Sequence, residues 1–410
     1  MQTRLTRELL DTPAGAEADR ILRSCTHCGF CLATCPTYQE LGDELDSPRG
    51  RIYLVKQLLE GSPAGEATRR HLDRCLTCHA CEATCPSGVR YTRLADLGRE
   101  LIERRAPRPP GERILRRLLR MVLPRRRLFA ALLVPGRLLR PALPRRLRES
   151  VPVRRRPAPR WPAGDAGRSR RVLMLEGCVQ PALAPAINPR TARLLQAAGF
   201  AVIRTPSAGC CGAIDQHLAA PDAARARARR NIDAWWPKVE AGVDAIVVNA
   251  SGCGAHLLDY ARLLADDPVY RSRAERVATL VREPVELLSD TDLPLAAAAA
   301  VPRRIVFQSP CTLQHAMGLG GRIEALLTRL GYELASSPEG HLCCGSAGTY
   351  SVLEPALSRR LRARKLGNLL SDAPEAVVTA NIGCLNHLAA GSPLPVYHWV
   401  ELVDPAPAAA

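Results

Sequence analysis

The chain has 410 residues, 47% of them hydrophobic and 24% charged, which excludes a wholly disordered chain and predicts two to three globular domains. No run approaches the roughly 18 consecutive apolar residues that cross a bilayer, and the first residues lack the apolar core of a signal peptide. We therefore expect a cytoplasmic protein. The formal charge of +17 is concentrated in residues 103–160, which hold 19 Arg, no Lys and three Glu.

Sixteen cysteines are the most informative feature of the composition. In a reducing cytoplasm disulfides are not expected, and so many idle thiols would be open to oxidation. The count therefore favours metal or cluster ligation.

The first region, residues 1–102, contains one cysteine motif twice, 50 residues apart. The pattern C-x2-C-x2-C-x3-C-P begins at Cys25 and again at Cys75. In this motif three thiolates hold one 4Fe–4S cluster and the fourth ligates the other cluster. Zinc fits poorly, because zinc sites normally use two separated pairs. The sequence predicts two clusters, the first on Cys25, Cys28, Cys31 and Cys85, and the second on Cys75, Cys78, Cys81 and Cys35.

A helix is expected between the two motifs. Ser47 fits a helix N-cap and Pro48 the first turn, so the pattern predicts a helix over residues 49–60. Ile52, Val55 and Leu58 would form its apolar face.

The second region, residues 103–170, reads as an Arg/Pro-rich amphipathic linker. Apolar residues such as Ile114 and Leu118 alternate with Arg113 and Arg117. A solvated linker helix, docking to an acidic partner and adsorption to anionic lipid are the alternatives. Nucleic acid is not an expected partner, because no recognition fold accompanies the charge.

The third region contains a second repeat, with a period of 133 residues. Short apolar runs at residues 172–175, 245–249, 305–308 and 376–380 alternate with helical patterns, which predicts parallel α/β units. A cysteine group follows each run, at the strand ends where sites form in such sheets. The repeated cysteines are Cys178, Cys210, Cys211 and Cys253 in the first copy, and Cys311, Cys343, Cys344 and Cys384 in the second.

The chemistry of these eight cysteines stays open at the sequence level. Four soft ligands per repeat suit a further iron–sulfur cluster or zinc, whereas structural thiols and a redox-active dithiol are the alternatives. Each copy ends in C-x2-H, at His256 and His387, and these histidines are either ligands or hydrogen-bonded neighbours.

The resulting fold class is a multidomain α+β protein. A helical two-cluster ferredoxin-like module is followed by two repeated α/β cysteine-rich domains, at residues 171–290 and 303–404. No catalytic residue and no flavin or nicotinamide site are expected in the chain.

Longer strings around the cysteines resemble the iron–sulfur subunits of bacterial glycolate oxidase, also called glycolate dehydrogenase. They include residues 42–53, residues 172–178 and residues 341–350, and the resemblance extends over nearly the whole chain. It implies an oxidoreductase subunit with two 4Fe–4S clusters that does not itself oxidise the substrate. Flavin-bearing partner subunits, with FAD on the partners only, would oxidise glycolate to glyoxylate.

The same resemblance implies electron transfer toward the membrane acceptor pool, with peripheral association at the cytoplasmic face of the inner membrane. The alternatives are the iron–sulfur subunit of an anaerobic glycerol-3-phosphate dehydrogenase or of another 2-hydroxy-acid dehydrogenase, such as a lactate dehydrogenase. The third alternative is an enzyme similar to the heterodisulfide reductase B subunit. In that family the last element is usually C-x2-C, whereas this chain has C-x2-H twice.

Overall fold

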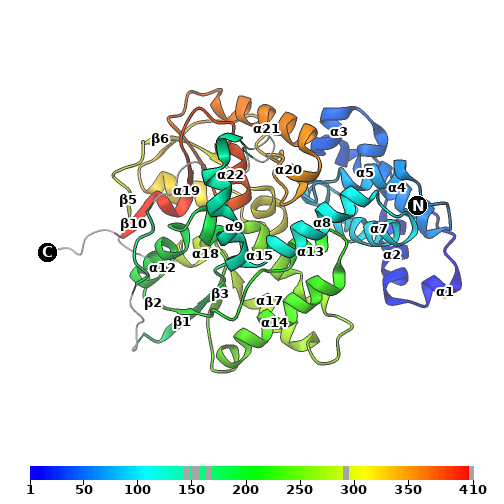
Figure 1. The fold of residues 1–410 in the computed structure, drawn as a ribbon, viewed down its shortest axis with the longest axis horizontal. Helices are drawn as coiled ribbons and strands as arrows, with labels where there is room; N and C mark the ends of the chain where they lie inside the picture. The colour runs from blue at the N-terminus through cyan, green and yellow to red at the C-terminus, as the bar shows by residue number, and fades with distance from the viewer. Residues whose placement is uncertain (143–147, 149–150, 152–156, 163–167, 290–294, 406–410) are drawn as a thin grey trace.

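The N-terminal region is helical and packs around one apolar core (Figure 1). The computed structural model describes residues 1–142, 148, 151, 157–162, 168–289 and 295–405. The helices of this region are α1 (Arg7–Leu10), α2 (Pro13–Ser24), α3 (Pro36–Leu41), α4 (Pro48–Leu59), α5 (Glu66–Asp73), α6 (Ala80–Ala83) and α7 (Tyr91–Arg105), with 3-10 turns η1 (Phe30–Leu32) and η2 (Glu44–Asp46).

The helix expected between the cysteine motifs is present as α4. The Ser47 hydroxyl accepts a hydrogen bond from the Gly50 amide at 3.0 Å, which caps the first turn. Ile52, Val55 and Leu58 are buried in the N-terminal core, so the predicted apolar face is confirmed.

The Arg-rich region forms two helices, α8 (Pro110–Val122) and α9 (Arg126–Leu138), followed by η3 (Arg140–Ala142). Arg108 and Arg116 are buried against Asp73 of the N-terminal region, with closest N–O distances of 2.5 and 3.1 Å. On the other side, Arg126 pairs with Glu176 at 2.7 Å. These two helices therefore connect the N-terminal region to the first cysteine-rich domain through ion pairs.

The first cysteine-rich domain is a parallel four-stranded sheet with the order β2-β1-β3-β4. Its strands are β1 (Arg170–Met174), β2 (Phe200–Arg204), β3 (Ala245–Val247) and β4 (Val281–Arg282). Its helices are α11 (Gln180–Leu183), α12 (Ile187–Ala197), α13 (Ala213–His217), α14 (Pro221–Glu240), α15 (Ser251–Leu258), α16 (Tyr260–Leu263), α17 (Arg271–Leu280) and α18 (Pro284–Leu288).

The second domain repeats this topology with the order β7-β6-β8-β9. Its strands are β6 (Arg304–Gln308), β7 (Glu333–Leu334), β8 (Ala376–Thr379) and β9 (Val396–His398). Its other elements are the π-helical turn η4 (Thr312–Ala316), α19 (Arg322–Arg329), α20 (Tyr350–Leu353), α21 (Pro355–Leu370), α22 (Ile382–Ala389) and η5 (Trp399–Glu401).

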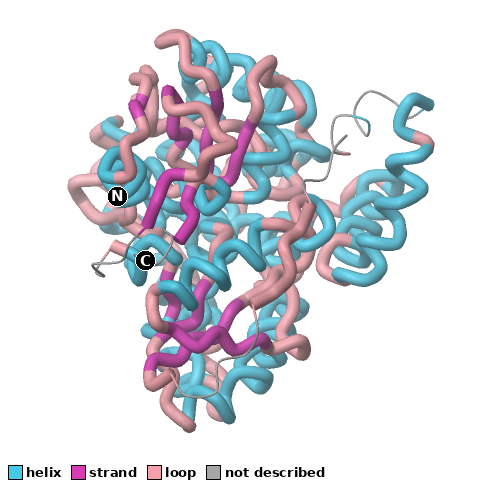
Figure 2. Tube along the Cα trace, turned by 90° about the vertical axis from the view of Figure 1, so that its left-hand side faces the viewer, coloured by secondary structure: helices cyan, strands magenta, loops and turns pink. Residues whose placement is uncertain are grey.

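The two repeats form separate sheets that share one core. Figure 2 shows the strands in two groups with helices around them. One cluster of buried side chains includes Val172 and Phe200 of the first repeat and Ile305 and Trp399 of the second. The last strand, β10 (Val403–Pro405), pairs antiparallel with β5 (Leu295–Ala297) in the segment that joins the repeats. The expected fold class, with its two repeated α/β domains, is confirmed.

Candidate metal centres

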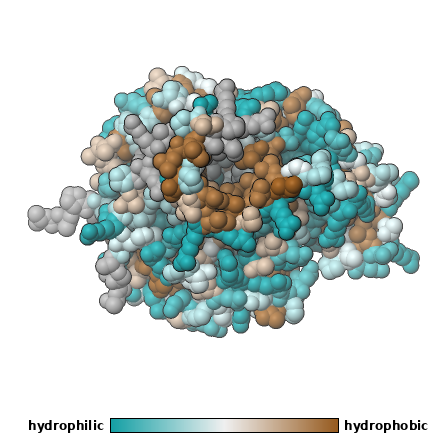
Figure 3. Space-filling view, in the orientation of Figure 1, coloured by the Kyte–Doolittle hydropathy of each residue, from teal (hydrophilic) through white to brown (hydrophobic). Residues whose placement is uncertain are grey.

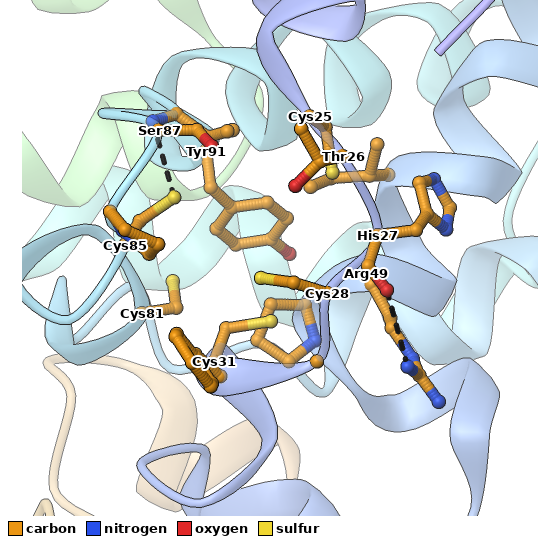
Figure 4. A pocket seen from close by; sticks show the side chains of 16 residues that line it. Cys25, Thr26, His27, Cys28, Cys31, Arg49, Cys81, Cys85, Ser87 and Tyr91 are labelled. Carbon is orange, nitrogen blue, oxygen red and sulfur yellow. Dashed lines mark hydrogen bonds between the residues drawn. The ribbon is translucent and has the colours of Figure 1, made fainter.

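The first four-cysteine set surrounds a small cavity of about 30 Å³. Cys25 ends α2, Cys31 lies in η1 and Cys85 follows α6, and Cys28 lies in the loop between the first two. Figure 4 shows the sulfur atoms around a common space, with the sulfur of Cys81 between those of Cys85 and Cys31 and the ring of Tyr91 drawn between the cysteines. Burial raises the pKa of the Cys31 thiol to about 11, so a thiolate there needs a bound cation. Such a donor set fits an iron–sulfur cluster.

The loops that carry the leading cysteines share an unusual backbone. His27 and Gly29 have φ angles of 57° and 90°, and the equivalent Thr77 and His79 have φ angles of 53° and 62°. Left-handed conformations are unfavourable for residues with a Cβ atom, by about 1 kcal/mol or more. The fold keeps this conformation in both copies, where it curls each loop around its cavity.

The second set surrounds an adjoining cavity of about 20 Å³. Its lining includes Cys35, Cys75, Cys78 and Cys81, and it shares Cys81 and Tyr91 with the first cavity. The grouping of the other seven cysteines thus matches the sets predicted from spacing, while Cys81 borders both cavities.

Two buried arginines flank the second cavity. Arg51 is 1% exposed and lines it, and Arg99 donates a hydrogen bond to the Cys75 carbonyl oxygen at 2.6 Å. Burial alone would raise the pKa of the Cys75 thiol, but the charges of Arg51 and Arg99 outweigh burial and lower it. This environment stabilises negative charge on the second site.

The C-terminal cysteines gather at the carboxyl ends of the parallel strands, as expected. In the second repeat the Sγ atoms of Cys311 and Cys343 are 3.8 Å apart. The hydrogen bond to Cys343 and burial both raise the pKa of the Cys311 thiol. In the first repeat, hydrogen bonds from the Cys178 and Cys211 thiols hold the pKa of Cys210 well below its ordinary value. Each repeat therefore brings its thiols into contact.

All eight of these cysteines line one cavity, with a volume of about 640 Å³. Its wall also includes Cys75 and Leu76 from the loop of the second N-terminal site. Leu76 and Cys343 belong to one buried cluster, against which Cys78 and Cys311 pack. The second repeat is thus in direct contact with the N-terminal region.

The two histidines of the C-x2-H pairs differ in their surroundings. The His387 ring lines the large cavity, and its Nε2 atom lies 3.3 Å from the Ser358 hydroxyl oxygen. His256 packs edge-on against Tyr260, and its Nε2 atom has no hydrogen-bond partner among the described residues. A Cβ atom on Gly212 would meet this Nε2 atom at 3.2 Å, and the φ angle of 105° at this position also favours glycine.

Cysteine spacing did not indicate Tyr91, Arg51 or Arg99, which border the N-terminal sites. Buried tyrosines and arginines carry no periodic signal, and their contacts depend on how α4 and α7 pack. The large cavity was also missed, because it forms between elements far apart in the chain.

Comparisons with known proteins agree with this architecture. A 4Fe-4S dicluster domain matches residues 21–89, and a cysteine-rich domain matches residues 172–258 and 305–389. The glycolate oxidase iron-sulfur subunit of Escherichia coli (strain K12) is 52% identical over 409 residues, 99% of both chains. The chain belongs to the family of glycolate oxidase iron–sulfur subunits.

Two further relatives differ in how much of the chain they match. The probable glycolate oxidase iron-sulfur subunit of Bacillus subtilis (strain 168) is 32% identical over 90% of this chain and 89% of that protein. Lactate utilization protein A of an Exiguobacterium strain is 25% identical over 57% of this chain and 96% of its own length. Only the glycolate oxidase subunits among these three match nearly the full chain.

Proposed function

We propose that the chain is the electron-transfer subunit of a glycolate dehydrogenase complex. The observation that carries the proposal is the pair of adjoining cysteine-lined cavities in a chain that matches a glycolate oxidase iron-sulfur subunit end to end. Flavin-bearing partner subunits oxidise glycolate to glyoxylate in this proposal, and this chain passes the electrons onward. Lactate is a less favoured substrate, because the lactate utilization relative matches only 57% of the chain, and glycerol 3-phosphate is less favoured because the relatives that match nearly the whole chain are glycolate oxidase subunits.

Two 4Fe–4S clusters are held by the N-terminal cysteines in this proposal. Cys25, Cys28, Cys31 and Cys85 hold one, and Cys75, Cys78, Cys81 and Cys35 hold the other. A bound 4Fe–4S cluster supplies reversible one-electron storage. The protein provides the curled loops, the apolar enclosure and, at the second site, the charges of Arg51 and Arg99.

The C-terminal cysteines hold further metal in this proposal, either as iron–sulfur clusters or as zinc. The support is that thiols from separate strand ends contact one another in each repeat. Structural thiols do not need such contacts between buried sulfur atoms.

Peripheral association with a membrane surface is the last part of the proposal. No helix among the described residues combines the length and apolar character that crossing a bilayer requires. Instead α8 and α9 expose apolar side chains such as Ile114 and Leu138 beside Arg113 and Arg117. Apolar side chains with neighbouring arginines suit the interface of an anionic membrane, which in this proposal is the cytoplasmic face of the inner membrane.

The test uses the purified complex under anaerobic conditions. Adding glycolate should bleach the visible absorbance of the clusters in the complex, whereas the isolated chain should not respond. Bleaching by lactate or glycerol 3-phosphate but not by glycolate would contradict the proposed substrate.

A further inference from the structure

The large cavity has more room than metal centres need. The two N-terminal cavities, each bounded by a four-cysteine set, have volumes of about 30 and 20 Å³. The shared cavity of the C-terminal cysteines has a volume of about 640 Å³. Two further metal centres, each as large as an N-terminal cavity, would fill a small part of this volume. The remaining space lies in the range of small-molecule binding sites.

Part of the lining of this cavity is apolar and comes mainly from the segment of α8 and α9, beside Glu112 and Arg116 of α8. Leu115 and Leu119 of α8 line the cavity, together with Leu123 directly after α8, Phe129 of α9 and Leu183 of α11. Since Leu115 is also 37% exposed, it connects the interior with the outer surface of α8.

The outer surface of these helices is unusually apolar. Ile114, Leu118 and Met121 of α8 are 60%, 46% and 43% exposed, and Leu132 and Val134 of α9 are 49% and 53% exposed. Figure 3 shows this apolar surface bordering a hollow where Figure 1 places α8 and α9. An exposed apolar surface of this kind suits contact with an apolar phase such as a membrane.

The lining also carries buried polar atoms without a hydrogen-bond partner among the described residues. Tyr350 is 6% exposed, lines the cavity, and its hydroxyl has no hydrogen-bond partner among the described residues. The buried Nδ1 atom of His217, another lining residue, also lacks a described partner. Leaving a buried polar group unpaired costs about 1–3 kcal/mol, so both atoms point to a polar ligand group.

We propose that this cavity binds a membrane quinone. Its carbonyl oxygens accept hydrogen bonds from Tyr350 and His217, and its tail leaves past Leu119 and Leu115 toward the apolar surface. This inference rests on the proposed function and names the electron acceptor. Reduction to the quinol takes two electrons, which the subunit receives from its flavin partner, and two protons from solvent; the carboxyl groups of Glu112 and Glu354 line the cavity.

The chemistry of the walls selects this class of ligand. The apolar side chains from α8 and α9 favour a ligand with an apolar tail, and a fatty acid would leave no use for the buried Tyr350 hydroxyl and His217 ring. A quinone combines a redox-active head, hydrogen-bond acceptors and an apolar tail. Cys75, a proposed cluster ligand, also lines this cavity.

The test measures binding to the full, iron-loaded chain by anaerobic calorimetry. The probe is a fully substituted benzoquinone with a decyl tail, because its ring has no free position for thiol addition. Tyr350→Phe removes one hydrogen bond without changing shape and should weaken binding about tenfold, equivalent to about 1.4 kcal/mol. Leu119→Trp fills the apolar channel and should weaken binding at least as much.

Leu118→Trp is the matched control, because Leu118 neighbours Leu119 on α8 but points outward. It should bind the probe like the parent chain, and iron content verifies that each variant is folded. If Leu119→Trp does not load iron, Leu123→Trp takes its place. Unchanged affinity in Tyr350→Phe, or equal affinity for decyl glucoside, overturns the site.

The two experiments distinguish an error in the quinone site from an error in the proposed function. Glycolate-dependent bleaching in the complex without probe binding removes the quinone site and leaves the function intact. Probe binding without bleaching by glycolate removes the proposed substrate and leaves the site.

Discussion

Arg51 and Asp46 form an ion pair that is completely enclosed: Arg51 Nη2 lies 3.1 Å from Asp46 Oδ1, and the side chains are 1% and 0% exposed. Arg51 also donates hydrogen bonds to the His71 carbonyl oxygen at 2.6 Å and to the Thr37 hydroxyl oxygen at 3.0 Å. Thr37 in turn lies 3.3 Å from Cys35 Sγ. The pair therefore joins α3, α4 and α5 beside the second cysteine cavity.

Replacing Arg51 by Met should strongly destabilise the N-terminal region. Arg74 Nη1, 2.8 Å from Asp46 Oδ2, remains as a partner of the buried carboxylate, so the loss should stay below the cost of a wholly uncompensated buried charge, about 3–5 kcal/mol. Arg49→Met is the control, because the Arg49–Glu44 pair is 33% and 45% exposed and such pairs contribute about 0–1 kcal/mol. Denaturant unfolding of the two variants measures the difference, and equal losses would contradict the assigned role.

Arg99→Gln should lower the midpoint potential of the cluster held by the Cys75 set. A nearby cation favours the reduced, more negative state, so its loss makes reduction harder by roughly 60 mV per 1.4 kcal/mol. Arg93→Gln is the control on the same helix, because Arg93 pairs with Glu17 at 2.6 Å. Potentiometric titration followed by electron paramagnetic resonance separates the two clusters. Parallel shifts of both clusters would argue against this placement of Arg99.

Cys28→Ser and Cys78→Ser should each affect a different cluster. Cys28 lines only the first of the two N-terminal cavities and Cys78 only the second. Each variant should lose or convert one paramagnetic signal and keep the other. Loss of the same signal in both variants, or fewer than about four irons in the reconstituted parent chain, would disprove the two-cluster assignment.

Stability should fall on acidification because of His398. Its Nε2 atom lies 3.0 Å from the Asn249 carbonyl oxygen and its Nδ1 atom accepts from the Val400 amide, so the neutral ring satisfies both contacts. Burial lowers the pKa of His398 to about 4, whereas an unfolded histidine has a pKa near 6.5. Between these values the unfolded chain binds a proton and the folded chain does not.

The contribution of His398 is therefore complete above about pH 6.5 and declines by about 3 kcal/mol as the pH falls toward 4. His398→Asn retains an acceptor for Val400 but has no titrating group, so its free energy of unfolding should depend less on pH in this window. Parallel pH profiles of the variant and the parent chain would exclude the assignment.

Replacing Arg113, Arg117, Arg125 and Arg127 by Gln should weaken binding to anionic vesicles. These side chains are exposed on α8 and α9 or in the turn between them. Each basic residue near an anionic surface contributes about 1 kcal/mol, and salt screens this attraction. The matched control variant replaces four other exposed arginines by Gln, all of them outside α8 and α9: Arg104, Arg105, Arg271 and Arg360. Sedimentation across a salt series compares the two variants, and equal binding would leave α8 and α9 without a lipid role.

The sequence by itself predicted two N-terminal cysteine sets and determined the capped helix after Ser47 and the order of the repeated α/β units. Each depends on residues close together in the chain or on a strict period, and such signals survive without tertiary contacts. The spacing of Cys25, Cys28 and Cys31 restricts them to one loop, and the 133-residue repeat fixes two similar sheets.

Only the tertiary structure decided what surrounds those cysteines. The wide cavity between the repeats, its apolar wall from α8 and the unpaired hydroxyl of Tyr350 all depend on contacts between distant segments. The Arg-rich segment reads as a solvated linker, because its arginines carry no sign of their partners. The fold buries Arg116 against Asp73, 43 positions earlier in the chain, and so turns the apolar side of α8 toward the cysteines.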